Sequence, residues 1–135
     1  MKYNQAVEHY LRNCEASGRS YNTINSYKSA LRIFGEYLDR QLISSVVSIT
    51  PDTLISWKSE AAGSVSPSSL RLYATIVNGF FAFCHEAGFI PANPYKAKLM
   101  HVAVKDSDRK DMLSHIITEQ DFASIMLADR PAHMH

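Results

Sequence analysis

Residues 20–38 read SYNTINSYKSALRIFGEYL, and this stretch indicates the fold more clearly than any other part of the chain. Its apolar side chains recur every three or four residues, as they do on one face of an α-helix. They are Ile24, Tyr27, Leu31, Phe34 and Leu38. Ser20 and Asn22 are both residue types that cap the start of a helix well. We therefore predict an amphipathic helix from about residue 20 or 22 to about residue 38.

The same spacing predicts a helix on each side of this one. Toward the N-terminus, residues 2–16 carry a second apolar stripe, which Gly18 ends: Tyr3, Ala6, Val7, Tyr10, Leu11 and Cys14. Toward the C-terminus, Thr50 is suited to cap a helix, Pro51 to stand at its first position and Asp52 to lie in its first turn. A short helix through Leu54 and Trp57 should follow.

A fourth helix is expected from about residue 68 to residue 87, after a loop at residues 61–65. Ser66 and Pro67 are typical of a helix start, and Gly88 of a helix end. The apolar face of this helix is Leu70, Tyr73, Ala74, Ile76, Val77, Phe80, Phe81 and Cys84. Residues 43–49 are rich in Val and Ile, but Ser interrupts them, and we interpret them as a loop. The predicted fold class is all-α, a compact four- to five-helix bundle.

Beyond Asn93 and Pro94 the pattern changes. Residues 96–111 are dense in charge and weakly periodic, as a linker is. Residues 112–135 open a further helix, in which Phe122, Ile125 and Met126 have no partner to bury them. We therefore expect a domain at residues 1–95, a linker at 96–111, and the truncated or excised start of another domain at 112–135.

The composition bounds the class of protein. A chain of 135 residues is one domain, or one domain and a stub, and 46% apolar residues are enough for a packed core. There is no apolar run long enough to span a bilayer and no signal peptide, so we expect a cytoplasmic protein that does not bind membranes. Cys14 and Cys84 should be buried free thiols. The net charge of +1 does not by itself indicate a nucleic-acid partner.

No catalytic or metal-binding set is recognisable. The six His residues form no His-Glu-x-x-His pair and no cluster with Cys, and there is no Gly-rich phosphate loop. His133 and His135 could bind a metal weakly, although a mobile tail is the more common meaning of such a pair. We expect no cofactor, no metal site and no catalytic site in this chain.

The polar faces of the two longest predicted helices are rich in hydrogen-bond donors. Opposite the apolar stripe of residues 20–38 lie Asn22, Asn25, Ser29, Arg32 and Glu36. Ser66, Ser68, Ser69, Arg71, Thr75 and Asn78 form a similar stripe on the fourth helix. Such side chains reach phosphates and base edges, but an ordinary solvated helix face has a similar composition. Lys58 fits either a phosphate contact or a soluble surface. We assign Tyr27, Tyr73, Phe80 and Phe81 to the core.

The order of these segments resembles the core-binding domain of the tyrosine recombinases, or phage integrases. Ser20-Tyr-Asn-Thr23 with Tyr27, followed by Leu31, Phe34, Tyr37 and Leu38, is similar to the start of that domain. The segments that follow in the same order are Thr50-Pro51-Asp52 with Trp57, Ser66-Pro67-Ser68-Ser69-Leu70, Phe80-Phe81, Gly88 and Asn93-Pro94. The resemblance covers roughly residues 3–127.

The resemblance implies a SAM-like helical bundle that clamps one side of a recombination site in double-stranded DNA. The helices that match the second and fourth here would face the major groove. The residues expected to face DNA are Asn22, Thr23, Asn25, Ser29, Arg32, Ser66, Ser68, Ser69, Arg71, Thr75 and Asn78. The catalytic Arg, His, Arg and Tyr groups of the family would lie beyond this chain. The parent protein is thus expected to be a strand-exchanging recombinase, bacterial or phage-encoded, that acts as a homo-tetramer on DNA, and the isolated chain a monomer.

A second hypothesis comes from another class of function. The near-neutral charge and the unburied Phe122, Ile125 and Met126 also fit a small helical protein–protein interaction module that does not bind DNA.

Overall fold

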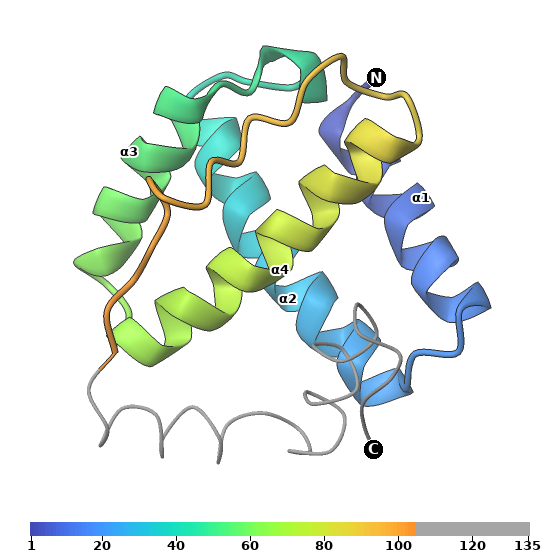
Figure 1. Ribbon diagram of the computed structural model, residues 1–135, viewed down its shortest axis with the longest axis horizontal. Coiled ribbons are helices and arrows are strands. Elements are labelled where there is room, and N and C mark those ends of the chain that lie inside the picture. Colours follow the sequence, from blue (N-terminus) through green and yellow to red (C-terminus); the bar gives the residue numbers. More distant parts are fainter. Residues whose placement is uncertain (105–135) are drawn as a thin grey trace.

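Four α-helices and one 3₁₀ turn make up residues 1–104, the part of the chain that the computed structural model describes. The elements are α1 (Tyr3–Ala16), α2 (Tyr21–Arg40), η1 (Val46–Ser48), α3 (Pro51–Ala62) and α4 (Pro67–Glu86) (Figure 1). Within these residues there is no strand, only an isolated bridge between Lys2 and Ser45. The all-α prediction is confirmed. Residues 43–49, predicted as a loop, contain η1.

Serine and threonine hydroxyls cap three of the helices. Ser20 Oγ accepts a hydrogen bond from the Thr23 amide at 3.1 Å, and Ser66 Oγ accepts one from the Ser69 amide at 3.2 Å. Thr50 caps α3 in the same way, and proline follows the cap in both α3 and α4. Such caps satisfy amides that have no partner inside the helix.

Glycine allows the tight turns that follow α1 and α4. Gly18 has a φ of +86° and Gly88 a φ of +82°. This left-handed conformation is strained for residues with a side chain but open to glycine. The two helix ends predicted from these glycines are therefore present in the structure.

Interlocking aromatic rings fill the centre of the bundle. The Phe34 ring meets the Trp57 ring edge-on, with centroids 5.1 Å apart, and Phe80 meets Phe81 edge-on at the same distance. The Tyr3 ring from α1 packs against Phe34 and Phe80, and its hydroxyl donates to the carbonyl of Leu31 at 2.6 Å. Edge-to-face pairs of this kind stabilise a core beyond the area they bury. The core thus joins α1, α2, α3 and α4.

The helices alternate in direction, so that two helices begin at each end of the bundle. The Tyr3 amide donates to the carbonyl of Ser44, and the Val46 amide to that of Met1, which brings the starts of α1 and α3 to one end. A short turn after α1 and another after α3 reverse the direction of the chain. Helices α2 and α4 therefore both begin at the other end, the lower one in Figure 1. We call that lower end, residues 17–25 and 63–71, the serine end, because Ser20 and Ser66 start its two helices. Residues 1–3 and 42–51 form the opposite end.

Residues 89–104 fold back over the bundle after α4. Ile90 and Met100 are buried in the core. Lys58 of α3 donates through Nζ to the carbonyl of Leu99 at 2.9 Å and to that of His101 at 3.0 Å. In Figure 1 this segment crosses from the upper end past α3 to the lower end. The first part of the predicted linker, residues 96–102, therefore lies against the bundle.

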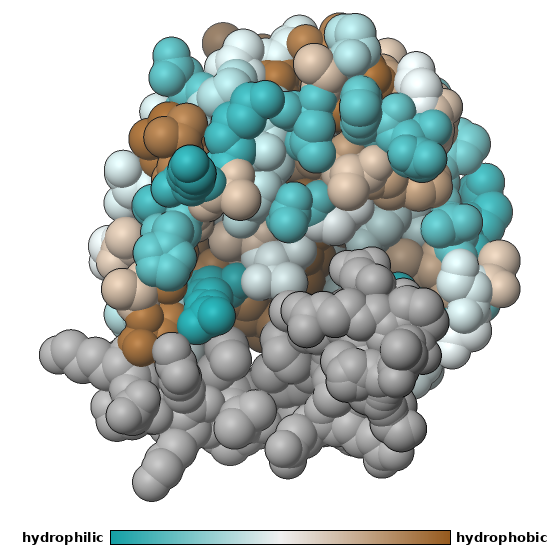
Figure 2. All heavy atoms as spheres, viewed as in Figure 1, coloured by the Kyte–Doolittle hydropathy of each residue, from teal (hydrophilic) through white to brown (hydrophobic). Residues whose placement is uncertain are grey.

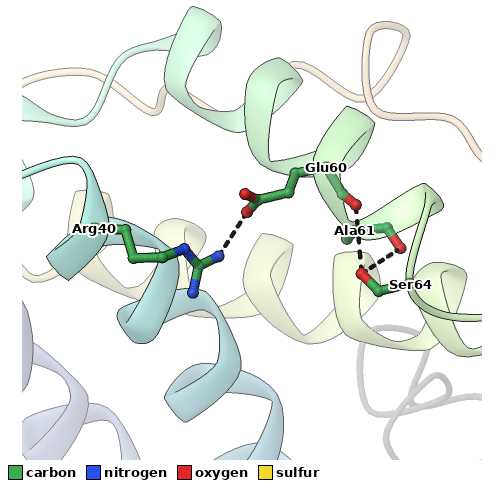
Figure 3. A network of polar contacts seen from close by, with 4 residues as sticks. All are labelled: Arg40, Glu60, Ala61 and Ser64. Atoms are coloured by element: carbon green, nitrogen blue, oxygen red, sulfur yellow. Dashed lines mark hydrogen bonds and ion pairs between the residues drawn. The ribbon is translucent and has the colours of Figure 1, made fainter.

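A surface ion pair joins α2 to α3. Arg40 Nη2 lies 2.6 Å from Glu60 Oε2, and Ser64 Oγ donates to the carbonyls of Glu60 and Ala61 where α3 ends (Figure 3). Both charged side chains are about half exposed, so the pair contributes at most about 1 kcal/mol. Cys14 and Cys84 are buried free thiols, as predicted.

Candidate nucleic-acid interface

Four of the five candidate residues on α2 lie on its exposed face. These are Asn22, Asn25, Ser29 and Arg32. Thr23 is different, because only 3% of its surface is exposed and its hydroxyl accepts a hydrogen bond from Ser20 Oγ at 3.0 Å. Thr23 therefore belongs to the capped start of the helix, turned toward the core.

The candidates on α4 divide in the same way. Ser66, Arg71 and Asn78 are exposed, and Ser69 and Thr75 are half-buried. Ser68 is 1% exposed, with its hydroxyl 3.2 Å from that of Ser66. Thr75 Oγ1 donates to the carbonyl of Arg71 at 2.9 Å, so this hydroxyl has a partner on its own helix.

The first residues of both stripes lie at the serine end, where the starts of α2 and α4 stand apart from each other in Figure 1. Asn22 and Asn25 lie at the start of α2, and Ser66, Ser69 and Arg71 at the start of α4. The guanidinium of Arg71 has no ion-pair partner within residues 1–104. A ligand large enough to span this end could therefore contact side chains of both helices.

The remaining candidates lie elsewhere on the two helices. Ser29 and Arg32 line a groove of about 420 Å³ between α1 and α2, to which α4 contributes no residue. Arg32 Nη1 also lies 2.8 Å from Glu36 Oε2, an exposed pair one helical turn apart. Asn78 lies past the middle of α4. The two stripes thus both start at the serine end, and the helices that carry them cross further along in Figure 1.

Acidic residues are absent from the sequence around the serine end. None of the 13 Asp and Glu residues of the chain lies in residues 16–35 or 61–85. Arg19, Lys28, Arg32 and Arg71 all fall within these two intervals. The near-neutral total therefore hides an uneven distribution along the sequence, with cations and no acidic residue in the two intervals that contain the starts of α2 and α4. Local charge of this kind attracts a polyanion even when net charge is low.

Unpaired backbone amides add hydrogen-bond donors at the serine end. The first amides of a helix lack intrahelical partners. The dipoles of α2 and α4 are offset at this end by those of α1 and α3, which end there, so the local donors matter more than a long-range field. Two helices begin at the serine end, and helix N-termini bind phosphate through such amides. Since Pro67 has no amide hydrogen, α2 offers more free donors than α4.

The surroundings of two residues, Lys58 and Tyr21, could not be read from the sequence pattern. Lys58, a possible phosphate contact, is occupied by the carbonyls of Leu99 and His101. Tyr21, which belongs to neither polar stripe, is 77% exposed at the first position of α2. Its place just after the cap and off the apolar stripe is the signal that could have identified it.

Other kinds of site find no support in the part of the chain that the structure describes. Residues 1–104 hold no group of three or more His, Cys, Asp or Glu side chains placed to bind a metal ion. No helix in this range combines the length and apolar character that crossing a bilayer requires. His115, Phe122, Ile125, Met126, His133 and His135 lie outside the described residues.

The fold and these helix starts define a class of protein, a small helical domain with donor-rich helix starts at one end. Residues 7–88 match the family model described as phage integrase, N-terminal SAM-like domain. The match covers more than half of the chain, and the chain belongs to this family. Membership implies DNA binding as part of a tyrosine recombinase. Comparisons with curated proteins and with solved structures gave no match.

Proposed function

We propose that this chain is the core-binding domain of a site-specific tyrosine recombinase and that its serine end contacts double-stranded DNA. The observation that supports this most directly is that α2 and α4 both begin at the serine end, in stretches of sequence (residues 16–35 and 61–85) that contain no acidic residue. Duplex DNA carries a dense row of phosphates, and cations together with free amides are the groups that bind it.

The proposed DNA contacts form two groups, one at the serine end and one further along the helices. Asn22, Asn25, Ser66, Ser69 and Arg71 make the first contacts, because their helices begin there. Ser29, Arg32, Thr75 and Asn78 lie further along the two helices and would reach DNA where a groove curves around the domain.

Thr23 and Ser68 serve the interface indirectly. Both side chains are buried beside the serines that cap α2 and α4. They fix the geometry of the helix starts, so that the exposed neighbours are already in position when DNA binds. Preorganisation of this kind lowers the entropy cost of association.

In the parent protein, this domain would hold one side of a recombination site while a catalytic domain acts from the other side. The reaction would be the integration or excision of DNA, carried out in the cytoplasm by a homo-tetramer. The chain itself would supply binding and no catalytic group, and on its own it would be a monomer.

Salt-dependent binding to duplex DNA tests the proposal. The full 135-residue chain is titrated with a labelled mixed-sequence duplex of about 30 base pairs between about 50 and 200 mM salt. Affinity should fall as salt rises, and Arg71→Ala should reduce the slope of log K against log [salt] by about one.

Lys2→Ala is the matched control. It also removes one exposed cation, but at the opposite end, where Lys2 pairs with Ser45. Its affinity and slope should equal those of the unaltered chain. Failure of the unaltered chain to bind any duplex at low salt would refute the proposed function. Equal effects of the two substitutions would refute the placement at the serine end.

A further inference from the structure

Tyr21 is the exposed aromatic residue of the described structure. All seven tyrosines lie within residues 1–104, and the other six are buried or half-buried. The phenylalanines of this range and Trp57 are also buried or half-buried. With 77% of Tyr21 exposed, its side chain makes no hydrogen bond, ring contact or ion pair with any described residue. Its ring contributes nothing to the core, so the fold does not account for a tyrosine here.

The position of Tyr21 points its ring beyond the end of the helix. Tyr21 is the first residue of α2, directly after the cap Ser20. Side chains on an α-helix lean toward its N-terminus, so that a long side chain at the first position extends past the last turn. We therefore expect a ring at this position to reach past the free amides of α2, at the serine end.

We infer that Tyr21 is a contact residue of the DNA interface, and that its ring packs against the sugar–phosphate backbone of a duplex. The inference rests on the proposed function and adds to it a neutral, apolar contact among cationic ones. A deoxyribose offers the ring an apolar surface next to the phosphate that the helix amides attract, and the phenolic hydroxyl can donate to a phosphate oxygen. Because tyrosine has few rotatable bonds, fixing it in a contact costs little entropy.

The surroundings of Tyr21 favour the backbone over a base as its partner. Amides at a helix start bind phosphate, and a ring at the same position reaches the adjoining sugar first. Stacking on a base requires an unpaired base, as in single-stranded nucleic acid. A contact to the thymine methyl in the major groove would depend on sequence. A backbone contact should therefore strengthen binding equally on all duplex sequences.

The test compares Tyr21→Ala and Tyr21→Phe in the full chain. Labelled AT-rich and GC-rich duplexes of equal length serve as probes at low salt. Tyr21→Ala should weaken binding by roughly tenfold on both, whereas Tyr21→Phe, which keeps the ring, should lose no more than about twofold to threefold. The slope of log K against log [salt] should not change, because a phenol releases no counterion, unlike Arg71→Ala.

Leu42→Ala is the matched control, since Leu42 is 93% exposed and lies at the opposite end. It should leave binding unchanged, and all three variants should keep the melting temperature of the unaltered chain. Unchanged binding by Tyr21→Ala, when Arg71→Ala binds more weakly, would overturn the inference and leave the proposed function standing. A loss confined to the AT-rich duplex would overturn the backbone assignment. Absence of binding by the unaltered chain would overturn both.

Discussion

Gly35 occupies a place in α2 where the ring of Tyr3 leaves no room for a side chain. A Cβ atom at this position would lie 2.9 Å from Cε2 of Tyr3. The ring cannot move aside freely, because it is buried and its hydroxyl is bonded to the carbonyl of Leu31. Overpacking of a core costs about 1–3 kcal/mol, and alanine regains up to about 1 kcal/mol of helix propensity. Gly35→Ala should therefore lower the free energy of unfolding by about 1–2 kcal/mol, as measured by urea denaturation.

Gly63→Ala provides the comparison. Gly63 closes α3 with a φ of −84°, and the nearest atom to a Cβ there, the carbonyl oxygen of Glu60, lies 3.5 Å away. The same change of residue should be neutral here, or stabilising by up to about 1 kcal/mol. Equal losses at the two positions would contradict the explanation from the Tyr3 ring.

Cys84 should make the fold sensitive to alkaline pH. Burial raises the pKa of its thiol from 9.0 to about 12. Between these values the unfolded chain loses the proton and the folded chain keeps it. The free energy of unfolding should therefore fall as pH rises above about 9, by up to about 1.4 kcal/mol per pH unit. Urea denaturation between about pH 8 and 10 measures this fall.

Cys84→Ala isolates the contribution of this thiol. The variant should lose stability less steeply over the same pH range, although burial also raises the pKa of Tyr3 and of Tyr10, which add to the fall at higher pH. Identical pH profiles for the two proteins would rule out the thiol as the cause.

Single residues show what the sequence could and could not indicate. The stripe pattern placed Thr23 and Ser68 with their polar neighbours, yet both are buried beside the capping serines. Helical spacing describes the middle of a helix well and its first turn poorly, because capping hydroxyls draw nearby polar side chains inward. The role of Lys58 depends on carbonyls more than 40 residues away, which no local pattern contains.

Helix α4 offers a way to separate capping from DNA binding. Aspartate caps a helix as well as serine does, so Ser66→Asp should keep the free energy of unfolding within about 0.5 kcal/mol. It also places a negative charge at the serine end, which should repel phosphate and weaken duplex binding by roughly tenfold or more at low salt. Denaturation and duplex titration of the same sample measure the two effects.

Thr50→Asp is the corresponding change at the opposite end. Thr50 caps α3, is exposed, and accepts the same kind of bond from the Thr53 amide. The new charge is the same, but in moderate salt its field decays over about 10 Å. Duplex binding should therefore stay near that of the unaltered chain. A loss as large as that of Ser66→Asp would show that binding follows total charge and not the serine end.

The four helices were predictable because their signals are local. Caps, prolines and glycines fixed their starts and ends to within a few residues, and the apolar stripes identified most of the core. The short turn η1 was missed because three residues carry no periodicity. The crossing of α2 and α4, and hence the divergence of their polar stripes, depends on side-chain packing that a sequence pattern does not describe.

At the scale of the whole molecule, Lys58 joins helix α3 to the segment that follows α4. Lys58→Met keeps the apolar stem but removes the two hydrogen bonds to residues 99 and 101. We expect amide hydrogen exchange to become faster in residues 97–102, by roughly tenfold, while α1 and α2 keep their protection. Mass spectrometry of exchanged peptides measures this change. Lys28→Met, on the exposed face of α2, should have no such effect.

Seen as a complete surface, the molecule keeps its polar residues outward in most places. Figure 2 shows polar groups over much of one face, with apolar ones scattered among them. The outward-facing polar stripes were predictable from hydropathy. That both stripes start at the same end of the bundle was not predictable, because it follows from the direction in which each helix runs.

The return path of residues 89–104 has a consequence for how the chain searches for its target. This path ends at the lower end in Figure 1, the end proposed to meet the duplex. A second DNA-binding unit joined to the chain there through a short flexible linker would be confined to a small volume around the bound DNA. Its effective concentration would be in the millimolar range. The two units would then stay bound to DNA longer without touching each other. A unit joined at the opposite end of the bundle would not have this advantage.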